Sequence, residues 1–204
     1  MTLREIIAKY DINGHEKDGG TDKDTFHSYI ELYEQLLAPF VDKAITLVEI
    51  GIQYGGSMLL WQDYLPKAQF IFVDNVNCIS PRILDHLDPS RTSLLFQDAY
   101  SEISANAVSR IADSGLPGGI DFIIDDGPHT LQSQIDFLRL YLPSLNKGGV
   151  ALIEDVQDVQ WFAHLEWEVK NAGSEFALEF AFERVDLRHV KGRYDDLVFV
   201  VKRL

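Results

Sequence analysis

Hydrophobic residues follow two different spacings along the chain, and the change between them divides it at about residue 40. From residue 3 to residue 10 they recur at the i, i+3, i+4, i+7 positions of an amphipathic helix. The polar, glycine-containing stretch 14–25 predicts a surface loop, and the helical spacing then resumes over 26–37 until Pro39 stops it. We therefore expect residues 1–40 to form helices and a loop, without a strand.

Beyond residue 41 the pattern changes to short aliphatic runs separated by helical spacing. The runs are apolar at consecutive positions, as in strands covered by helices on both faces of a sheet, and their alternation with helices predicts parallel strands. The expected strands are 45–50, 70–74, 93–96, 122–124, 149–153, 180–187 and 197–202. Because only nine residues join the last two runs, too few for a helical crossover, these two strands should be antiparallel. The pattern predicts an α/β fold, a Rossmann-like three-layer sandwich with a seven-stranded, mostly parallel sheet.

The composition excludes several classes of protein. A chain of 204 residues fits one compact domain with a sizeable core, and its net charge of −14 would repel nucleic acid. Its single cysteine, Cys78, can form neither an intramolecular disulfide nor a cysteine metal site. No apolar run is as long as a membrane span, and residues 1–8 lack the apolar core of a secretory signal. We expect a soluble, cytoplasmic protein that binds neither nucleic acid nor a membrane.

A glycine-containing loop closes the first expected strand and opens a helix, in the segment Glu49-Ile-Gly51-Ile-Gln-Tyr-Gly55-Gly-Ser57. Glycines at such a junction let the backbone approach a ligand at a helix N-terminus, which favours anionic groups. The spacing does not match the dinucleotide fingerprint G-x-G-x-x-G, which argues against NAD. The acid two positions before the first glycine suits an adenosyl ligand that carries a cationic amino-acid tail.

Two further acids end the next two strands. Asp74 ends the second strand, where a carboxylate can accept both ribose hydroxyls. Asp98, followed by Ala99, ends the third strand, where it could accept a hydrogen bond from an adenine amine. Each acid could instead cap a helix, and the glycines could serve only a tight turn. The ordered set at three successive strand ends favours a bound nucleoside.

Four carboxylates and a histidine follow the fourth and fifth strands. Asp125, Asp126 and His129 come after the fourth, and Glu154 and Asp155 after the fifth. In a sheet of order 3-2-1-4-5 these strand ends are neighbours, so the carboxylates should converge at the carboxyl edge of the sheet. Like charges at that density would raise each other's pKa, and a divalent cation with oxygen ligands, such as Mg²⁺ or Mn²⁺, removes the conflict. Helix capping and a solvated acidic rim are the alternative interpretation.

These motifs, in this order, resemble a known enzyme family. The E-x-G-x-x-x-G loop and the acids after the second and third strands are similar to class I S-adenosylmethionine-dependent methyltransferases, whose last strand runs antiparallel to the others. Over about residues 20–202 the chain resembles the metal-dependent sugar O-methyltransferases of macrolide tailoring, of the mycinamicin and macrocin type, and their cephalosporin hydroxylase-like relatives. The shared motifs are Thr21-Asp-Lys23, His27-Ser-Tyr29, Leu47-Val-Glu-Ile-Gly51, Ser57 with Trp61, Asp125-Asp-Gly-Pro-His129, Ile153-Glu-Asp155 and Asp195-Asp196.

The resemblance implies a cofactor, a metal and a base. The cofactor would be S-adenosylmethionine, bound by Glu49, Gly51, Gly55, Ser57, Asp74, Asp98 and Ala99. The residues that match the family's metal ligands, for Mg²⁺ or Mn²⁺, are Asp126, Glu154 and Asp155. His129 matches the general base, and Asp125 is kept as an alternative ligand because it directly precedes Asp126. Pro128 stands where the family usually has serine, which could alter how the His129 turn is held.

The resemblance also implies an organisation and a substrate class. Residues 1–40 would form N-terminal helices and a lid loop, with Asp22, Lys23, His27 and Tyr29 over the cofactor and the acceptor, and 41–204 the methyltransferase domain. A solvated loop is the alternative for those four residues. The expected acceptor is a small molecule, through a hydroxyl of a sugar or glycosylated natural product. The alternatives are a catechol-like aromatic diol and a non-catalytic S-adenosylmethionine-binding scaffold protein, and a homo-oligomer is compatible with the sequence.

Overall fold

A computed structural model describes residues 1–14, 18–115, 118–176 and 178–204 of the chain. Its seven strands form one sheet of order β3-β2-β1-β4-β5-β7-β6. The strands are β1 (Thr46–Ile50), β2 (Gln69–Asp74), β3 (Thr92–Phe96), β4 (Ile120–Asp125), β5 (Leu145–Ile153), β6 (Phe180–Asp186) and β7 (Leu197–Arg203). Strands β1 to β5 pair in parallel, whereas β7 runs antiparallel to both of its neighbours. The predicted mostly parallel sheet with an antiparallel last strand is confirmed.

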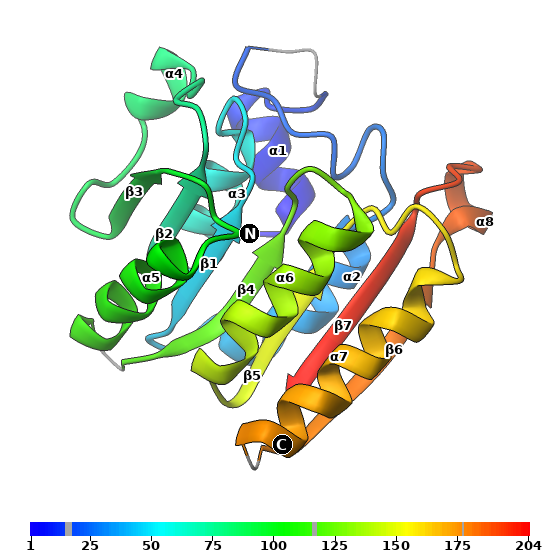
Figure 1. Cartoon of the computed structure of the whole chain (residues 1–204). Coiled ribbons are helices and arrows are strands. Elements are labelled where there is room, and N and C mark those ends of the chain that lie inside the picture. The colour runs from blue at the N-terminus through cyan, green and yellow to red at the C-terminus, as the bar shows by residue number, and fades with distance from the viewer. Residues whose placement is uncertain (15–17, 116–117, 177) are drawn as a thin grey trace.

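Helices cover both faces of this sheet (Figure 1). The helices on one face are α1 (Leu3–Tyr10), α2 (Ile30–Leu37) and α3 (Gly56–Tyr64), and those on the other are α5 (Glu102–Ser114), α6 (Leu131–Tyr141) and α7 (Trp161–Phe176). The shorter helices are α4 (Pro81–Leu84), α8 (Arg188–Lys191) and the 3₁₀ turns η1 (Ala38–Phe40) and η2 (Leu142–Ser144). None of the described helices has the length and apolar character needed to cross a membrane.

The two faces of the sheet contribute to two separate hydrophobic cores. In β1, Leu47 packs in the core beneath α1, α2 and α3, while Val48 and Ile50 pack in the core beneath α5, α6 and α7. Successive strand residues point to opposite faces, so both sets must be apolar when helices cover both faces. This burial accounts for the consecutive aliphatic positions in the strand segments.

The N-terminal segment differs from the sequence-based prediction in two respects. Helix α2 begins at Ile30 rather than at residue 26, because residues 22–29 form turns in which the Tyr29 N–H bonds to the Lys23 carbonyl. The stretch 14–25 is not a surface loop throughout, since residues 19–21 and Lys23 are buried. Residues 15–17 of that stretch lie outside the described residues. Much of the segment 18–29 is therefore packed into the protein, although residues 18, 25 and 26 are exposed.

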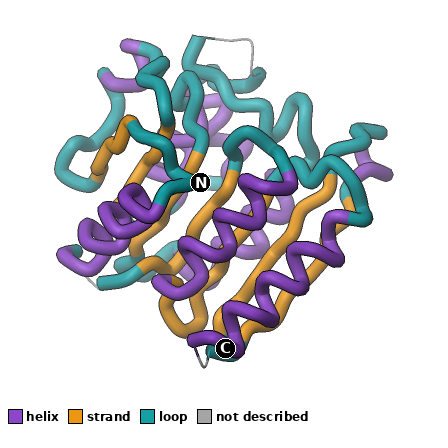
Figure 2. The backbone as a smooth tube through the Cα atoms, viewed as in Figure 1, coloured by secondary structure: helices purple, strands orange, loops and turns teal. Residues whose placement is uncertain are grey.

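One edge of the sheet brings together strand ends from distant parts of the sequence. Ile50 pairs with Asp125, and Asp125 pairs with Ile153, so β1, β4 and β5 end side by side. Because β7 runs the other way, its beginning reaches this same edge. The loops along this edge, with the N-terminal segment among them, run across the top of Figure 2. Segments from both ends of the sequence therefore reach the carboxyl ends of the parallel strands.

Candidate functional site

A cavity of about 590 Å³ opens at the carboxyl ends of β1, β2, β3 and β4. The predicted cofactor residues that line it are Gly51, Ser57, Asp74, Asp98 and Ala99. Glu49 and Gly55 are not part of its lining, and Glu49 is fully buried. The ordered strand ends thus form a single cavity, although not every predicted residue reaches it.

The loop between β1 and α3 is held closely against the neighbouring strands. Gly51 has a φ of 83°, and a Cβ atom there would lie 1.9 Å from the carbonyl oxygen of Asp126, so only glycine fits. Asp74 Oδ2 accepts hydrogen bonds from the backbone N–H groups of Ile52 and Gln53, both at 3.0 Å. The acid at the end of β2 therefore fixes the loop that forms one wall of the cavity.

Glu49 supports this loop from inside the protein. Its Oε2 accepts a hydrogen bond of 2.8 Å from the hydroxyl of Ser57, which itself lines the cavity. Burial raises the pKa of Glu49 to about 7, and the Lys23 ammonium, 3.7 Å from Oε1, opposes that effect. Glu49 thus acts on the cavity through Ser57.

Asp126, His129 and Asp155 meet at the edge of the cavity and line it. One potential ligand atom from each residue lies within 4.8 Å of the others, and His129 Nε2 is 3.8 Å from Asp126 Oδ1. His129 adopts a left-handed φ of 53°, directly before Thr130, whose side chain caps α6. Burial, with the neighbouring Asp126 carboxylate, raises the pKa of Asp155 to about 6. The structure brings together two of the predicted ligands and the predicted base.

Glu154, the third predicted ligand, faces a different partner. Its Oε2 accepts a hydrogen bond of 2.5 Å from Lys23 Nζ, and its Oε1 accepts one of 2.7 Å from the Tyr33 hydroxyl. Lys23 is 1% exposed and also donates to Asp126 Oδ2 at 2.7 Å. Burial by itself lowers the pKa of this ammonium, but Asp126, Glu154 and Glu49 outweigh that effect and raise it well above its usual range. A lysine predicted for the lid is thus a buried cation among carboxylates.

Asp125, the predicted alternative to Asp126, points elsewhere. Its Oδ1 accepts a hydrogen bond of 2.5 Å from the Tyr100 hydroxyl, and burial raises its pKa to about 7. Asp125 does not line the cavity, whereas Asp126 does. The carboxylate beside Asp155 and His129 is that of Asp126.

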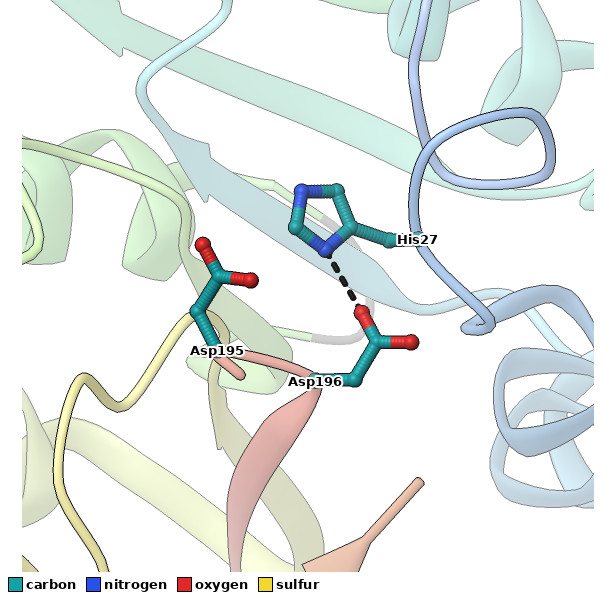
Figure 3. A group of neighbouring side chains, drawn as sticks. All are labelled: His27, Asp195 and Asp196. Carbon is teal, nitrogen blue, oxygen red and sulfur yellow. Dashed lines mark hydrogen bonds and ion pairs between the residues drawn. The ribbon is translucent and has the colours of Figure 1, made fainter. Parts of the chain in front are cut away.

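A second buried group joins the N-terminal segment to the start of β7 (Figure 3). His27 Nδ1 lies 2.8 Å from Asp196 Oδ1, beside Asp195, and 3.3 Å from Asp155 Oδ1. The Tyr29 hydroxyl donates to Asp155 Oδ1, and its ring stacks on that of His27 at a centroid distance of 4.9 Å. His27 and Tyr29 therefore both contact the Oδ1 atom of Asp155. Of the predicted lid residues, Asp22 is the one that lines the cavity.

Sequence reasoning did not identify the hydroxyls of Tyr33 and Tyr100, and it included Asp195-Asp196 among the motifs of the resemblance without giving the pair a role in the site. The two aspartates carried a signal, because they directly precede an antiparallel strand, whose beginning lies where parallel strands end. The tyrosines carried none, because an aromatic residue in an apolar pattern is indistinguishable from an ordinary core residue.

The acidic group satisfies the requirements of a hard divalent cation. Asp126 and Asp155 each direct a carboxylate oxygen toward the space beside His129, at the cavity wall. Mg²⁺ in proteins is commonly held by one or two carboxylates, with water and substrate completing six oxygen ligands. The residues present therefore fit a magnesium or manganese ion.

Comparison with known proteins places this site in a family. A family model described as a methyltransferase domain matches residues 48–156, more than half of the chain. The chain belongs to this methyltransferase domain family. The match includes the end of β1 from residue 48, all of β4 and β5, and the residues Asp126, His129 and Asp155, but it excludes Lys23 and the rest of the N-terminal segment.

Curated relatives share the sequence over part of their length. The chain is 33% identical over 149 residues to the 8-demethyl-8-alpha-L-rhamnosyl tetracenomycin-C 2'-O-methyltransferase of Streptomyces olivaceus, covering 70% of this chain and 36% of that protein. It is 26% identical over 145 residues to the mycinamicin VI 2''-O-methyltransferase of Micromonospora griseorubida, covering 66% and 33%. The chain thus spans about a third of the length of these relatives, and the expected resemblance to sugar O-methyltransferases is confirmed.

A solved structure shares the fold. The MycE methyltransferase from the mycinamycin biosynthetic pathway, in complex with Mg and SAH, superposes with a TM-score of 0.70 at 17% identity. The superposition covers the whole of this chain and 55% of that one. The Rossmann-like methyltransferase fold is therefore confirmed.

Proposed function

We propose that this protein transfers a methyl group from S-adenosylmethionine to a hydroxyl of a sugar or glycosylated natural product, with a bound divalent cation, Mg²⁺ or Mn²⁺. The observation that carries this proposal is the position of Asp126, His129 and Asp155 at the wall of the cavity that Gly51 and Asp74 also line. The named sugar O-methyltransferases among the relatives support the substrate class.

The cavity would hold the adenosyl cofactor. The β1–α3 loop with Gly51 would accommodate its amino-acid end, Asp74 its ribose hydroxyls and Asp98 its adenine amine. The volume of about 590 Å³ lies within the usual range of ligand sites, about 300–1,000 Å³. Glu49 would act indirectly by holding Ser57.

Methyl transfer is a substitution at carbon in which the acceptor oxygen forms a bond to the methyl group while the carbon–sulfur bond breaks. The products are the methyl ether and S-adenosylhomocysteine, and the acceptor hydroxyl loses its proton. Asp126 and Asp155 would hold the divalent cation, whose positive charge would help to orient that hydroxyl and stabilise the developing negative charge on its oxygen. His129 would receive the proton as general base, and Asp155 Oδ2, 3.5 Å from its Nε2, would stabilise the resulting imidazolium.

In this proposal residues 41–204 form the methyltransferase domain, and 1–40 form N-terminal helices with a segment over the site. The buried positions of His27 and Tyr29 support a fixed contribution from that segment, because both side chains contact Asp155. Asp22 at the cavity wall remains the candidate for direct contact with cofactor or acceptor.

The test is methyl transfer from labelled S-adenosylmethionine to paired acceptors in the presence of Mg²⁺. Each glycosylated small molecule is assayed beside its own aglycone, with catechol as a third acceptor and mass spectrometry to locate the methyl group. Asp126→Asn should abolish transfer, while Asp113→Asn, at an exposed position on α5, should not change it. Transfer to the sugar supports the proposal. Transfer to catechol alone would show that the acceptor is an aromatic diol and not a sugar. Cofactor binding without transfer to any acceptor would favour a non-catalytic scaffold protein.

A further inference from the structure

A second hollow lies at the same edge of the sheet as the candidate site. Its volume is about 520 Å³, and its lining residues are Asp186, Arg188, His189, Gly192, Arg193 and Tyr194. They run from the last residue of β6 to the segment before β7, around α8 at the right of Figure 1. The family match ends at residue 156, and the proposed reaction uses none of these side chains. Their role therefore has to follow from their position and charge.

Hydrogen bonds place this hollow beside Asp155. The Val156 N–H donates to the Leu197 carbonyl at 3.0 Å, which holds the start of β7 against the segment that follows β5. The Tyr194 hydroxyl donates to Gln157 Oε1 at 2.7 Å, and Gln157 Nε2 donates to the Asp155 carbonyl at 3.1 Å. Tyr194 thus lines the hollow and is also joined, through one side chain, to a residue of the candidate site.

The segment 187–194 is basic in an acidic chain. The net charge of the whole chain is −14, yet this segment contains no acidic residue. Its basic residues are Arg188, His189, Lys191 and Arg193. The Lys191 ammonium donates to the backbone carbonyls of Asp24 and His27, which are neutral groups and do not cancel its charge. The segment therefore forms a local positive patch that attracts anions.

The two arginines of the hollow retain hydrogen-bond donors for a ligand. Among the described residues, the Arg188 side chain makes two hydrogen bonds to Asp186, and that of Arg193 makes one of 3.0 Å to Asp195. A guanidinium has five N–H donors in a planar fork that matches the oxygens of a carboxylate or phosphate. Asp186 is half exposed, and an exposed ion pair contributes little free energy, so a ligand can replace it at small cost.

The charge of the candidate site determines which end of an acceptor can be anionic. Asp22, Asp126 and Asp155 line the cavity, where a hydroxyl can donate hydrogen bonds but an anion is repelled. A divalent ion would offset only two of these three negative charges. The hollow has the opposite charge, and Tyr194, which is 61% exposed, offers an aromatic surface beside it. An acceptor with a hydroxyl at one end and an anion at the other would therefore bind in one orientation.

We propose that this hollow binds an oxyanion group of the acceptor, a carboxylate or a phosphate, through Arg188 and Arg193, while the hydroxyl to be methylated lies beside His129. The acceptor is then an acidic glycoside, which carries its negative charge away from the hydroxyl that reacts. This inference rests on the proposed function and narrows its substrate class from sugars in general to anionic ones.

The first experiment measures binding without catalysis. The metal-free full chain, labelled with ¹⁵N, is titrated with glucuronate, glucose 1-phosphate and glucose at constant ionic strength, and the amide resonances of residues 187–194 are followed. An anion should shift these resonances saturably and bind at least about tenfold more tightly than glucose, as expected of charge-assisted hydrogen bonds. Shifts with glucuronate alone identify a carboxylate, and shifts with glucose 1-phosphate alone identify a phosphate. No saturable shift with either anion, or an equal response to glucose, would overturn the proposal.

Variants distinguish this subsite from general attraction of anions. Arg188→Gln and Arg193→Gln should each weaken binding of the anion by about tenfold or more, and Arg188→Lys should recover part of the loss because it keeps the charge without the fork. Arg110→Gln is the matched control, because it removes the same charge from an exposed arginine on α5. Equal losses in Arg188→Gln and Arg110→Gln would contradict a site in the hollow. Arg188 is itself exposed, so its replacement should not prevent folding.

Methyl transfer separates the inference from the proposed function. Methyl glucuronide is assayed beside methyl glucoside, and glucose 1-phosphate beside glucose. The anionic member of a pair should have a KM at least about tenfold lower, and Arg188→Gln should remove that difference without a change in kcat or in affinity for S-adenosylhomocysteine. Transfer to neutral sugars with equal KM would overturn the inference and leave the proposed function in place. Anion binding at residues 187–194 without transfer to any acceptor would support the subsite and contradict the proposed reaction.

Discussion

His129 Nε2 lies 3.5 Å from Asp155 Oδ2, although the two residues follow different strands of the sheet. The pairing of Asp125 with Ile153 sets this distance, because it aligns the ends of β4 and β5. A base that becomes cationic when it takes a proton is favoured by a carboxylate at this position. Replacement of His129 should therefore lower turnover while leaving cofactor and metal binding nearly unchanged.

Replacing His129 should lower turnover by roughly 10²- to 10⁴-fold, the contribution of a positioned base, with cofactor and metal affinity nearly unchanged. His129→Asn is the better variant than His129→Ala, because asparagine tolerates the left-handed φ of 53° at this position. Turnover is measured at saturating Mg²⁺, and cofactor affinity by calorimetry. Turnover of His129→Asn close to that of the parent would reject His129 as the general base.

Removal of the divalent ion should abolish methyl transfer, and added Mg²⁺ should restore it. The reason is that Asp126 and Asp155 would repel each other and leave the acceptor hydroxyl without a positive charge beside it. The measurement is labelled methyl transfer before and after chelation, with calorimetry of S-adenosylhomocysteine to show that the protein remains folded. Full turnover in completely chelated protein would contradict the metal assignment.

Asp74→Ala should weaken binding of S-adenosylhomocysteine by about 1.5 to 3 kcal/mol, the usual loss of hydrogen bonds to a charged group. It should also loosen the β1–α3 loop, because Asp74 Oδ2 accepts the N–H groups of Ile52 and Gln53. Calorimetry gives the affinity, and Asp113→Ala on α5 is the exposed control. NAD should bind far more weakly than the adenosyl ligand, and equal binding would defeat the cofactor assignment.

Lys23→Met should reduce the free energy of unfolding by about 3 to 5 kcal/mol, the cost of leaving one member of a buried ion pair alone. Adding Glu154→Gln should recover much of that loss, since both charges are then absent. Denaturant unfolding of the metal-free proteins measures both effects. A loss in Lys23→Met of less than about 1 kcal/mol, as for an exposed pair, would show that the ammonium is solvated.

The stability of the metal-free protein should decrease as pH rises from about 4.5 to 7, through Glu49. Its pKa is about 7 in the folded protein against an ordinary 4.5, so the folded state binds this proton more tightly than the unfolded state. Its ionisation costs the fold about 3 kcal/mol, at about 1.4 kcal/mol for each pKa unit. Glu49→Gln should therefore stabilise the protein more at pH 8 than at pH 5, measured by denaturant unfolding. Glu183→Gln, at an exposed position, should show no such difference, and a parallel response of both variants would contradict the prediction.

The arrangement of the sheet was largely predictable, because its cause is local. Aliphatic residues at consecutive positions such as Leu47 and Val48 indicate a strand with helices on both faces, and the observed strands differ from the predicted ones mainly by a few residues at their ends. The convergence of Asp126 and Asp155 followed from the same rule, since both come directly after neighbouring parallel strands.

The partners of those acids were not predictable, because they depend on long-range packing. Nothing in the spacing of Lys23 distinguishes a buried ammonium from a solvated lysine in a polar loop. Its position follows from the packing of residues 20 and 21 against α3, where a Cβ atom on Gly56 would lie 2.3 Å from the Gly20 carbonyl oxygen. Likewise, the pattern at Glu154 shows a carboxylate at a strand end but not that Tyr33 and Lys23 bond both of its oxygens.

The contact between His27 and Asp196 joins residues 169 positions apart. A chain emerging from the ribosome presents its N-terminal part first. The strands β1 to β5 and both residues of the proposed metal pair can therefore leave the exit tunnel while Asp196 is still inside it. The carboxylate that pairs with His27 is translated only after all five of these strands. Completion of the site thus depends on translation beyond β5, and a chain that ended before β7 would carry the cofactor loop without the closed acidic centre.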